Sequence, residues 1–240
     1  MTLVIGFVSE KYSLIASDTK ITYANNILEP TYRSKLVSLS GLMGWSSGTG
    51  LGQFLDRLKE KLKNKDISNI NNLEKDVMVI FNTTVKEFLN DGYSKNDIYR
   101  SAISFSTACV INGEIFNMIG YISEKWTKGE LYFIDPNSFH LMYPDKYSQE
   151  NIDKFTKKYK LENVNNNINS VLIQTLEMFN EISKASSENV SRECEIGLQY
   201  IDNDIVHKRL LVINMDDYEN GKNDTIKDIR IDSLRITAPN

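Results

Sequence analysis

The side chains that could do chemistry in this chain are hydroxyls, carboxylates, lysines and the chain terminus, because histidine and cysteine are scarce. The two cysteines, Cys109 and Cys194, cannot build a disulfide framework, and with two histidines they form a weak metal-binding set. His140 and His207 lack a Cys-x-x-Cys or His-x-x-x-His partner, so we interpret them as structural. We therefore expect no metal and no cofactor. Enzyme classes whose catalysis depends on histidine or cysteine are disfavoured.

Charge and hydropathy exclude two kinds of partner. A net charge of −4 over 240 residues argues against nucleic acid, because phosphate binding requires clustered Lys and Arg. The basic run from Arg57 to Lys65 is interpreted as a solvated helix end. No stretch approaches the ~18 apolar residues of a membrane span. The apolar segment Thr2–Val8 has no basic residue before it, unlike a secretion signal. We expect a cytoplasmic protein without a membrane partner.

Three segments near the start of the chain place hydroxyl, carboxylate and lysine side chains in a defined order. Met1-Thr2 leads directly into an apolar strand. The segment Leu14–Thr22 reads Leu-Ile-Ala-Ser-Asp-Thr-Lys-Ile-Thr. The segment Ser34–Gly50 begins with a lysine-bearing strand and ends in Ser-Ser-Gly-Thr-Gly, just before an amphipathic helix.

These segments resemble the N-terminal-nucleophile hydrolases, in particular proteasome β-type subunits and bacterial proteasome-related peptidases. The spacing supports the resemblance, because Asp18 lies sixteen residues after Thr2, as in the family. Lys35 lies thirty-three residues after Thr2, about one more than usual, which a one-residue loop insertion would absorb. The match is most specific over the first third of the chain.

The resemblance implies a mechanism in which the terminus replaces the missing histidine. Once Met1 is removed, the α-amine of Thr2 lies on the same residue as the hydroxyl, and its ordinary pKa of ~8 leaves part of it neutral at pH 7. That amine can accept the hydroxyl proton directly or through one water. A buried Lys35 would lower the pKa of both groups, and Asp18 would keep Lys35 charged and oriented. Taken singly, Asp18 could be a strand-end carboxylate and Lys35 a solvated lysine.

The resemblance also implies supporting groups. A turn at Ser46-Ser47-Gly48 would offer backbone N–H groups to an oxyanion, and the family implies that Ser47 or its neighbour supplies one. The same turn could be a plain helix N-cap. Glu188-Asn-Val-Ser191 loosely matches an Asp-x-x-Ser pair of the family, which makes Glu188 and Ser191 candidates. The family's Gly-Ser-Gly turn is missing, and its region holds Tyr143–Ser148, so the position of a supporting serine is left open.

The order of the elements agrees with the fold of this family. Periodicity predicts a first block of strands and helices at Thr2–Val8, Tyr12–Ile21, Lys35–Leu39, Leu42–Ser46, Leu51–Leu62 and Leu73–Leu89. The second block comprises strands and helices at Ser101–Ile111, Ile115–Ile122, Glu130–Ile134, Phe139–Tyr143, Ser148–Tyr159 and Ile168–Ser183, with closing strands at Glu195–Ile201 and Val206–Met215. Strands grouped before helices, then repeated, predict an α+β four-layer αββα sandwich with two antiparallel sheets between helix layers. We expect a single domain over residues 1–215 and a polar C-terminal tail over residues 216–240.

Three functions remain open at this stage. The leading hypothesis is a proteasome-like threonine hydrolase that cleaves peptide or amide bonds through an acyl-enzyme on Thr2. The family implies a ring-like homo-oligomer and a peptide or protein substrate, and an ATPase partner would be of unknown identity. A catalytically inactive assembly or scaffold subunit is the first alternative, motivated by Glu188 and the missing Gly-Ser-Gly turn. An amidase acting on a small molecule is the second.

Overall fold

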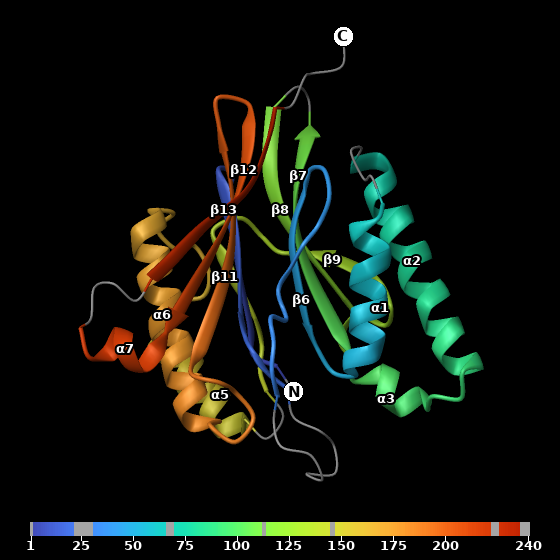
Figure 1. Cartoon of the computed structure of the whole chain (residues 1–240), viewed down its shortest axis with the longest axis horizontal. Helices are drawn as coiled ribbons and strands as arrows, with labels where there is room; N and C mark the ends of the chain where they lie inside the picture. Colours follow the sequence, from blue (N-terminus) through green and yellow to red (C-terminus); the bar gives the residue numbers. More distant parts are fainter. Residues whose placement is uncertain are drawn as a thin grey trace.

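Two antiparallel sheets stacked face to face form the centre of the molecule (Figure 1). The computed structural model describes residues 2–21, 31–65, 70–111, 114–144, 147–221 and 226–235, with the backbone alone at residues 70–71 and 226–235. Met1, Thr22 and the Asp145-Lys146 pair therefore lie outside the described residues.

The first sheet has the order β10-β1-β2-β11-β12-β13, and the second has the order β5-β6-β7-β8-β9. Strands of the first sheet are β1 (Val4–Val8), β2 (Tyr12–Asp18), β10 (Ser138–Met142), β11 (Glu193–Asp202), β12 (Ile205–Asn214) and β13 (Ile226–Arg235). Strands of the second are β5 (Val37–Ser38), β6 (Met43–Thr49), β7 (Ala102–Ile111), β8 (Glu114–Ser123) and β9 (Leu131–Phe133). A small third sheet pairs β3 (Lys20–Ile21) with β4 (Thr31–Tyr32).

Helices cover the outer faces of both sheets, so the predicted four-layer αββα sandwich is confirmed (Figure 1). The second sheet is covered by α1 (Gly52–Lys63) and α2 (Ile70–Asn90), and the first by α5 (Gln149–Lys158) and α6 (Ile168–Ala185). Three short helices, α3 (Lys95–Tyr99), α4 (Glu124–Thr127) and α7 (Met215–Glu219), complete the described elements. None of the described helices is long and apolar enough to cross a membrane.

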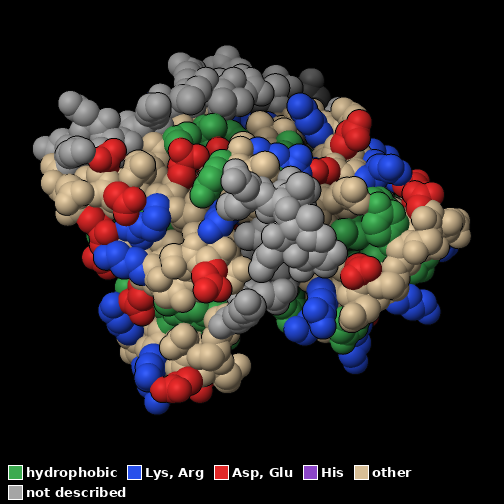
Figure 2. Space-filling view, turned by 60° about the horizontal axis from the view of Figure 1, so that its bottom comes forward, with side chains coloured by type: hydrophobic (Ala, Val, Ile, Leu, Met, Phe, Trp, Pro, Cys, Tyr) green, Lys and Arg blue, Asp and Glu red, His purple; other side chains and the backbone are tan. Residues whose placement is uncertain are grey.

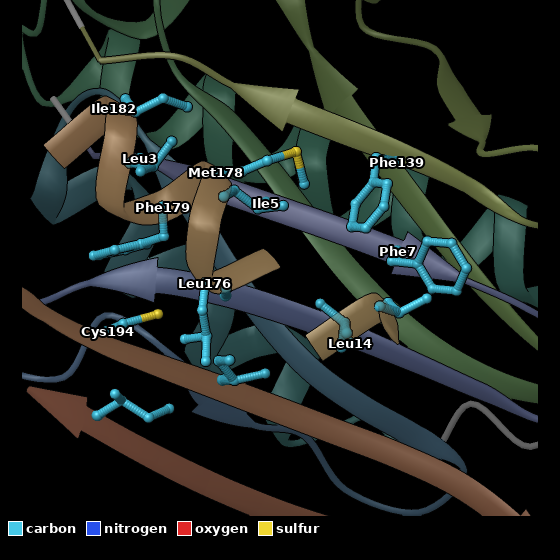
Figure 3. Packing of buried hydrophobic residues seen from close by; sticks show 14 of the residues in the cluster. Leu3, Ile5, Phe7, Leu14, Phe139, Leu176, Met178, Phe179, Ile182 and Cys194 are labelled. Carbon is cyan, nitrogen blue, oxygen red and sulfur yellow. The ribbon is translucent and has the colours of Figure 1, made fainter. Parts of the chain in front are cut away.

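Four clusters of buried apolar residues fill the spaces between the layers in the described part of the chain. Alternate residues before and within β1 point to opposite sides, so Leu3 and Ile5 pack toward α6 while Val4 packs between the sheets. Figure 3 shows the first of these clusters, in which Met178, Phe179 and Ile182 of α6 pack with residues of β1. Each fully buried side chain of this kind contributes ~1.5–3 kcal/mol. This burial on both faces explains why the start of the chain reads as a continuous apolar run.

The expected strand Tyr12–Ile21 ends at Asp18, because Lys20 and Ile21 pair with β4 in the third sheet, and Lys35 precedes β5. Two further differences concern residues 46–49 and the end of the chain. Residues 46–49 do not form a turn or an N-cap but continue strand β6, because they pair with β7 through Ser47–Ser104 and Thr49–Ala102. The bend comes at Gly50, whose φ of +120° suits glycine, and the N-cap of α1 is Leu51, without a side-chain cap. In the region expected to be a polar tail, residues 226–235 form β13, which pairs with β12 at the sheet edge. Charged residues are frequent in edge strands, and here they obscure the alternating apolar pattern from which a strand is predicted.

Candidate active site

Asp18 is the centre of the site, and it joins three parts of the chain. It is the last residue of β2 and has no exposed surface. Its Oδ1 accepts a hydrogen bond from the Leu3 N–H at 3.0 Å, and its Oδ2 accepts one from the Lys20 N–H at 3.0 Å. The Ser191 N–H donates to the same Oδ2 at 3.5 Å. A buried carboxylate with several donors is stable only when its charge is balanced nearby.

Lys35 supplies that balance. Its Nζ lies 2.9 Å from Asp18 Oδ2, and its side chain is 10% exposed. Burial lowers the pKa of Lys35, while the charge of Asp18 and the hydrogen bond to it act in the opposite direction. The structure therefore brings together Asp18 and Lys35, two of the candidate site residues.

Two residues that sequence reasoning missed hold the segment around Lys35. Lys59 of α1 donates a hydrogen bond from Nζ to the Lys35 carbonyl at 2.7 Å. Glu195 of β11 accepts one from the Ser34 hydroxyl at 2.8 Å, and burial raises the pKa of this carboxyl group. The sequence contained a feature that could have indicated that each of the two residues is buried. Lys59 lies four residues after Leu55 on the apolar stripe of α1, and Glu195 lies between the apolar residues Cys194 and Ile196 of β11.

Thr2 lies at the wall of a cavity of about 100 Å³, and Lys35, Gly48 and Lys59 line the same cavity. The residue is 7% exposed, and its backbone N–H donates to Thr49 Oγ1 at 3.2 Å. Thr2 is fixed further by its neighbour Leu3, whose N–H is held by Asp18. The start of the chain is therefore anchored at the end of β2, where the cavity opens.

Ser47 and Gly48 have different environments although they are adjacent. The Ser47 hydroxyl donates to Ser17 Oγ at 3.0 Å in the buried space between the sheets, and Ser47 is not among the residues lining the cavity. Gly48 does line it. A Cβ atom at Gly48 would lie 2.4 Å from the Ala102 carbonyl oxygen, so the position accepts only glycine. Gly48, and not Ser47, is therefore the residue of this pair that lines the cavity.

Ser191 joins the site and Glu188 does not. The Ser191 hydroxyl accepts a hydrogen bond from the Thr19 N–H at 3.0 Å and lies 3.1 Å from Thr19 Oγ1, beside Asp18. Glu188 is exposed on the turn after α6 and makes no hydrogen bond or ion pair to the described residues of the site. In the region of the missing Gly-Ser-Gly turn, Ser148 caps α5 by accepting from the Asn151 N–H.

Metal ligation has no obvious place in the described part of the chain. Within those residues, no three His, Cys, Asp or Glu side chains gather in a way that could hold an ion. The polar side chains of the residues that line the cavity are hydroxyl, ammonium, guanidinium and carboxylate groups, which suit acid–base and electrostatic chemistry.

Comparison with known proteins identifies the fold but no closer relationship. No protein-family model matches the sequence, and no curated protein matches it. Among solved structures, an "Anbu (Gly-1) mutant" from Hyphomicrobium sp. strain MC1 is similar with a TM-score of 0.59 and 13% identity, over 96% of this chain and 88% of that chain. Anbu, described as an "ancestral beta-subunit", from Yersinia bercovieri gives a TM-score of 0.58 and 12% identity, over 96% and 87%. The chain therefore has a proteasome-like fold, and at this identity the likeness extends to the fold alone.

Proposed function

We propose that this chain is an N-terminal threonine hydrolase that cleaves peptide or amide bonds once Thr2 is its first residue. One observation carries the proposal: Thr2, Lys35 and Gly48 line one cavity, while the buried Asp18 holds Lys35 in place. The proteasome-like fold supports the proposal by analogy only.

The reaction follows from the groups at the cavity. The Thr2 hydroxyl attacks the amide carbonyl while the Thr2 amine takes its proton, and Lys35 stabilises the negative charge that develops. The Gly48 N–H is the proposed donor to the oxyanion. The C–N bond then breaks, and the leaving amine receives the proton from the Thr2 ammonium. Water attacks the resulting ester, which releases the acid and restores the Thr2 hydroxyl, so one water is consumed per bond.

The proposal extends to assembly. The solved structures with this fold include a protein described as a beta-subunit, and this supports self-association of the chain into a homo-oligomer. The ring-like form remains part of the proposal, and the mass of the assembly by light scattering tests it.

Hydrolysis by matched variants tests the function. The intact mass should show that Met1 is absent, and the wild type should release fluorophore from a mixture of peptide and simple amide substrates. Thr2→Ala should lose the activity, because it removes the nucleophile. Thr156→Ala, on the exposed face of α5, is the control and should keep it. A native protein that retains Met1 would contradict the proposal.

A second result would favour the scaffold alternative. If the wild type carries Thr2 as its first residue, forms the oligomer and shows no more hydrolysis than Thr2→Ala, the chain is an assembly subunit. The exposed position of Glu188 is the structural feature that favours this alternative.

A further inference from the structure

The cavity beside Thr2 has more positive than negative groups on its wall. Its charged lining consists of Lys20, Arg33, Lys35, Lys59 and Asp56. Two of the cations have acidic partners, since Lys35 pairs with Asp18 and Arg33 pairs with Asp56. The Lys20 ammonium donates to a backbone carbonyl instead.

Lys59 is the buried cation of this wall that has no acidic partner. It is 5% exposed, and among the described residues no carboxylate lies within ion-pair distance of its Nζ. Its hydrogen bond to the Lys35 carbonyl uses one of three N–H donors. An ammonium group buried without a counter-charge is unfavourable, and a bound anion would relieve this.

The groups that face Lys59 leave it charged at neutral pH. Burial lowers its pKa to about 8; Asp56 and Glu195 act against the decrease, while Lys35 and Arg33 add to it. At pH 7 most of the ammonium remains protonated.

The start of α1 adds to the positive field. Gly50 and Gly52 line the cavity at this helix end, the N-cap residue Leu51 provides no side-chain cap, and the first turn contains no acidic residue. The N–H groups of a first turn carry a partial positive charge that favours anions. Lys59, which has no acidic partner, and the start of α1 therefore both make the electrostatic potential of this cavity more positive.

The positive excess is local to the cavity. Figure 2, which turns the lower end of Figure 1 forward, shows Lys and Arg side chains interspersed with Asp and Glu side chains over the visible surface. A general affinity of this face for polyanions is therefore not expected. A volume of about 100 Å³ is well below the ~300–1,000 Å³ of pockets for drug-sized ligands and suits one short side chain.

We propose that the substrate carries a carboxylate on the acyl side of the scissile amide, as in a Glu or Asp residue, and that Lys59 binds this carboxylate. The inference rests on the proposed function, because Thr2 must attack the carbonyl of the residue whose side chain enters the cavity.

Matched substrates test the selectivity. Ala-Ala-Glu-aminomethylcoumarin and its Gln counterpart differ only in charge, and glutaric monoanilide with its uncharged diamide analogue represents small molecules. The acidic member of the cleaved pair is expected to have the higher kcat/KM. In Lys59→Gln, which keeps an N–H donor for the Lys35 carbonyl, the ratio should fall roughly 10- to 100-fold, as for loss of a charged hydrogen bond.

Lys61→Gln is the matched control, because Lys61 is on the same helix and its ammonium pairs with Glu87 instead. It should leave the ratio unchanged. Equal cleavage of the two members by the wild type, or an acidic preference that survives Lys59→Gln, overturns the proposal. Cleavage of the peptides or of the anilide tells which source of the carboxylate the site accepts.

A binding arm separates this proposal from the proposed function. Thr2→Ala is titrated with fluorescein-labelled Ala-Ala-Glu-Ala-Ala and with its Gln counterpart. If no substrate is hydrolysed by the wild type, preferential binding of the Glu peptide that Lys59→Gln removes still supports Lys59 as the anion site. Equal or absent binding of both peptides contradicts it.

Discussion

The molecule buries lysine ammonium groups in two different surroundings. Lys59 is 5% exposed at the cavity of Thr2, and Lys208 of β12 is 1% exposed. Both donate a hydrogen bond of 2.7 Å to a backbone carbonyl, Lys59 to Lys35 and Lys208 to Leu39. The second bond links the first sheet to the segment that follows β5 of the second. Lys208 thus joins two layers, whereas Lys59 borders space that a ligand can enter.

The comparison shows that burial of a charge does not by itself identify a functional site. Lys59 and Lys208 share low exposure and a carbonyl partner. The difference lies in whether the group faces a cavity together with other reactive groups. Substitutions at the cavity should therefore affect catalysis, and equivalent substitutions in the closed interior should affect only stability.

The largest effect is expected at Lys35. Lys35→Met removes the charge proposed to stabilise the transition state, so kcat/KM per folded molecule should fall by roughly 10²- to 10⁴-fold. Lys208→Met should keep the wild-type rate per folded molecule, with the folded fraction taken from near-ultraviolet circular dichroism. A similar loss of rate in both variants would remove the distinction between the two regions.

Stability must be separated from catalysis in that experiment. Lys35→Met leaves Asp18 buried without its partner, which should decrease the free energy of unfolding by about 3–5 kcal/mol. Adding Asp18→Asn removes the uncompensated charge and should restore part of the stability, measured by urea unfolding. The recovery is partial because the amide nitrogen of Asn cannot accept the backbone N–H bonds that one Asp18 oxygen accepts. The double variant should remain inactive. Recovery of activity together with stability would show that Lys35 has only a structural role.

Two glycines of β6 give the next comparison. A Cβ atom would lie 2.4 Å from the Ala102 oxygen at Gly48, and 2.3 Å from Ser106 Oγ at Gly44. Gly48→Ala and Gly44→Ala should each decrease the free energy of unfolding by about 1–3 kcal/mol. Only Gly48→Ala should also decrease kcat, by roughly 10²- to 10³-fold, if its N–H serves the oxyanion. An equal kcat in the two folded variants would exclude Gly48 from that role.

The smallest expected effect concerns the stability of the two buried lysines. Because burial lowers the pKa of Lys59 from 10.5 to about 8, its charged form is disfavoured in the folded state. Removing the charge in Lys59→Met should therefore increase the free energy of unfolding below pH 8 by at most roughly 3 kcal/mol. The Lys35 carbonyl loses its donor in the same variant, which reduces this gain by about 1 kcal/mol. Lys208→Met should decrease the free energy of unfolding by about 1–3 kcal/mol, because the buried Leu39 carbonyl loses its donor.

The sign of the pH dependence follows from proton binding. Between pH 8 and 10.5 the unfolded chain holds the Lys59 proton and the folded chain does not, so wild-type stability contributed by this group rises with pH. The advantage of Lys59→Met should shrink over that interval, measured by chemical unfolding at several pH values. An advantage that is constant from pH 7 to 10.5 would mean that Lys59 does not titrate there.

The layers of the fold were predicted correctly from the sequence, whereas the site residues stay a prediction. In long segments such as α6 and β7, the spacing of the apolar residues within the segment indicates a helix or a strand. These segments were therefore assigned to the correct type of element. The proximity of Asp18 and Lys35 could be expected only through the spacing that resembles a family. Lys59 and Glu195 were missed because they belong to a helix and a strand remote in sequence, and only the fold brings them to Lys35. The strand over residues 226–235 was missed because charged residues mask its pattern.

Acylation of residue 2 is the most direct test of the central claim, that Thr2 is a nucleophile. The wild-type protein is incubated with a β-lactone, which opens on attack and adds its whole mass to the nucleophile as an ester. Intact and peptide mass spectrometry should show one adduct, on the hydroxyl of an N-terminal Thr2, and none on Thr2→Ala. An unlabelled wild type, or equal labelling of Thr2→Ala, would contradict the account.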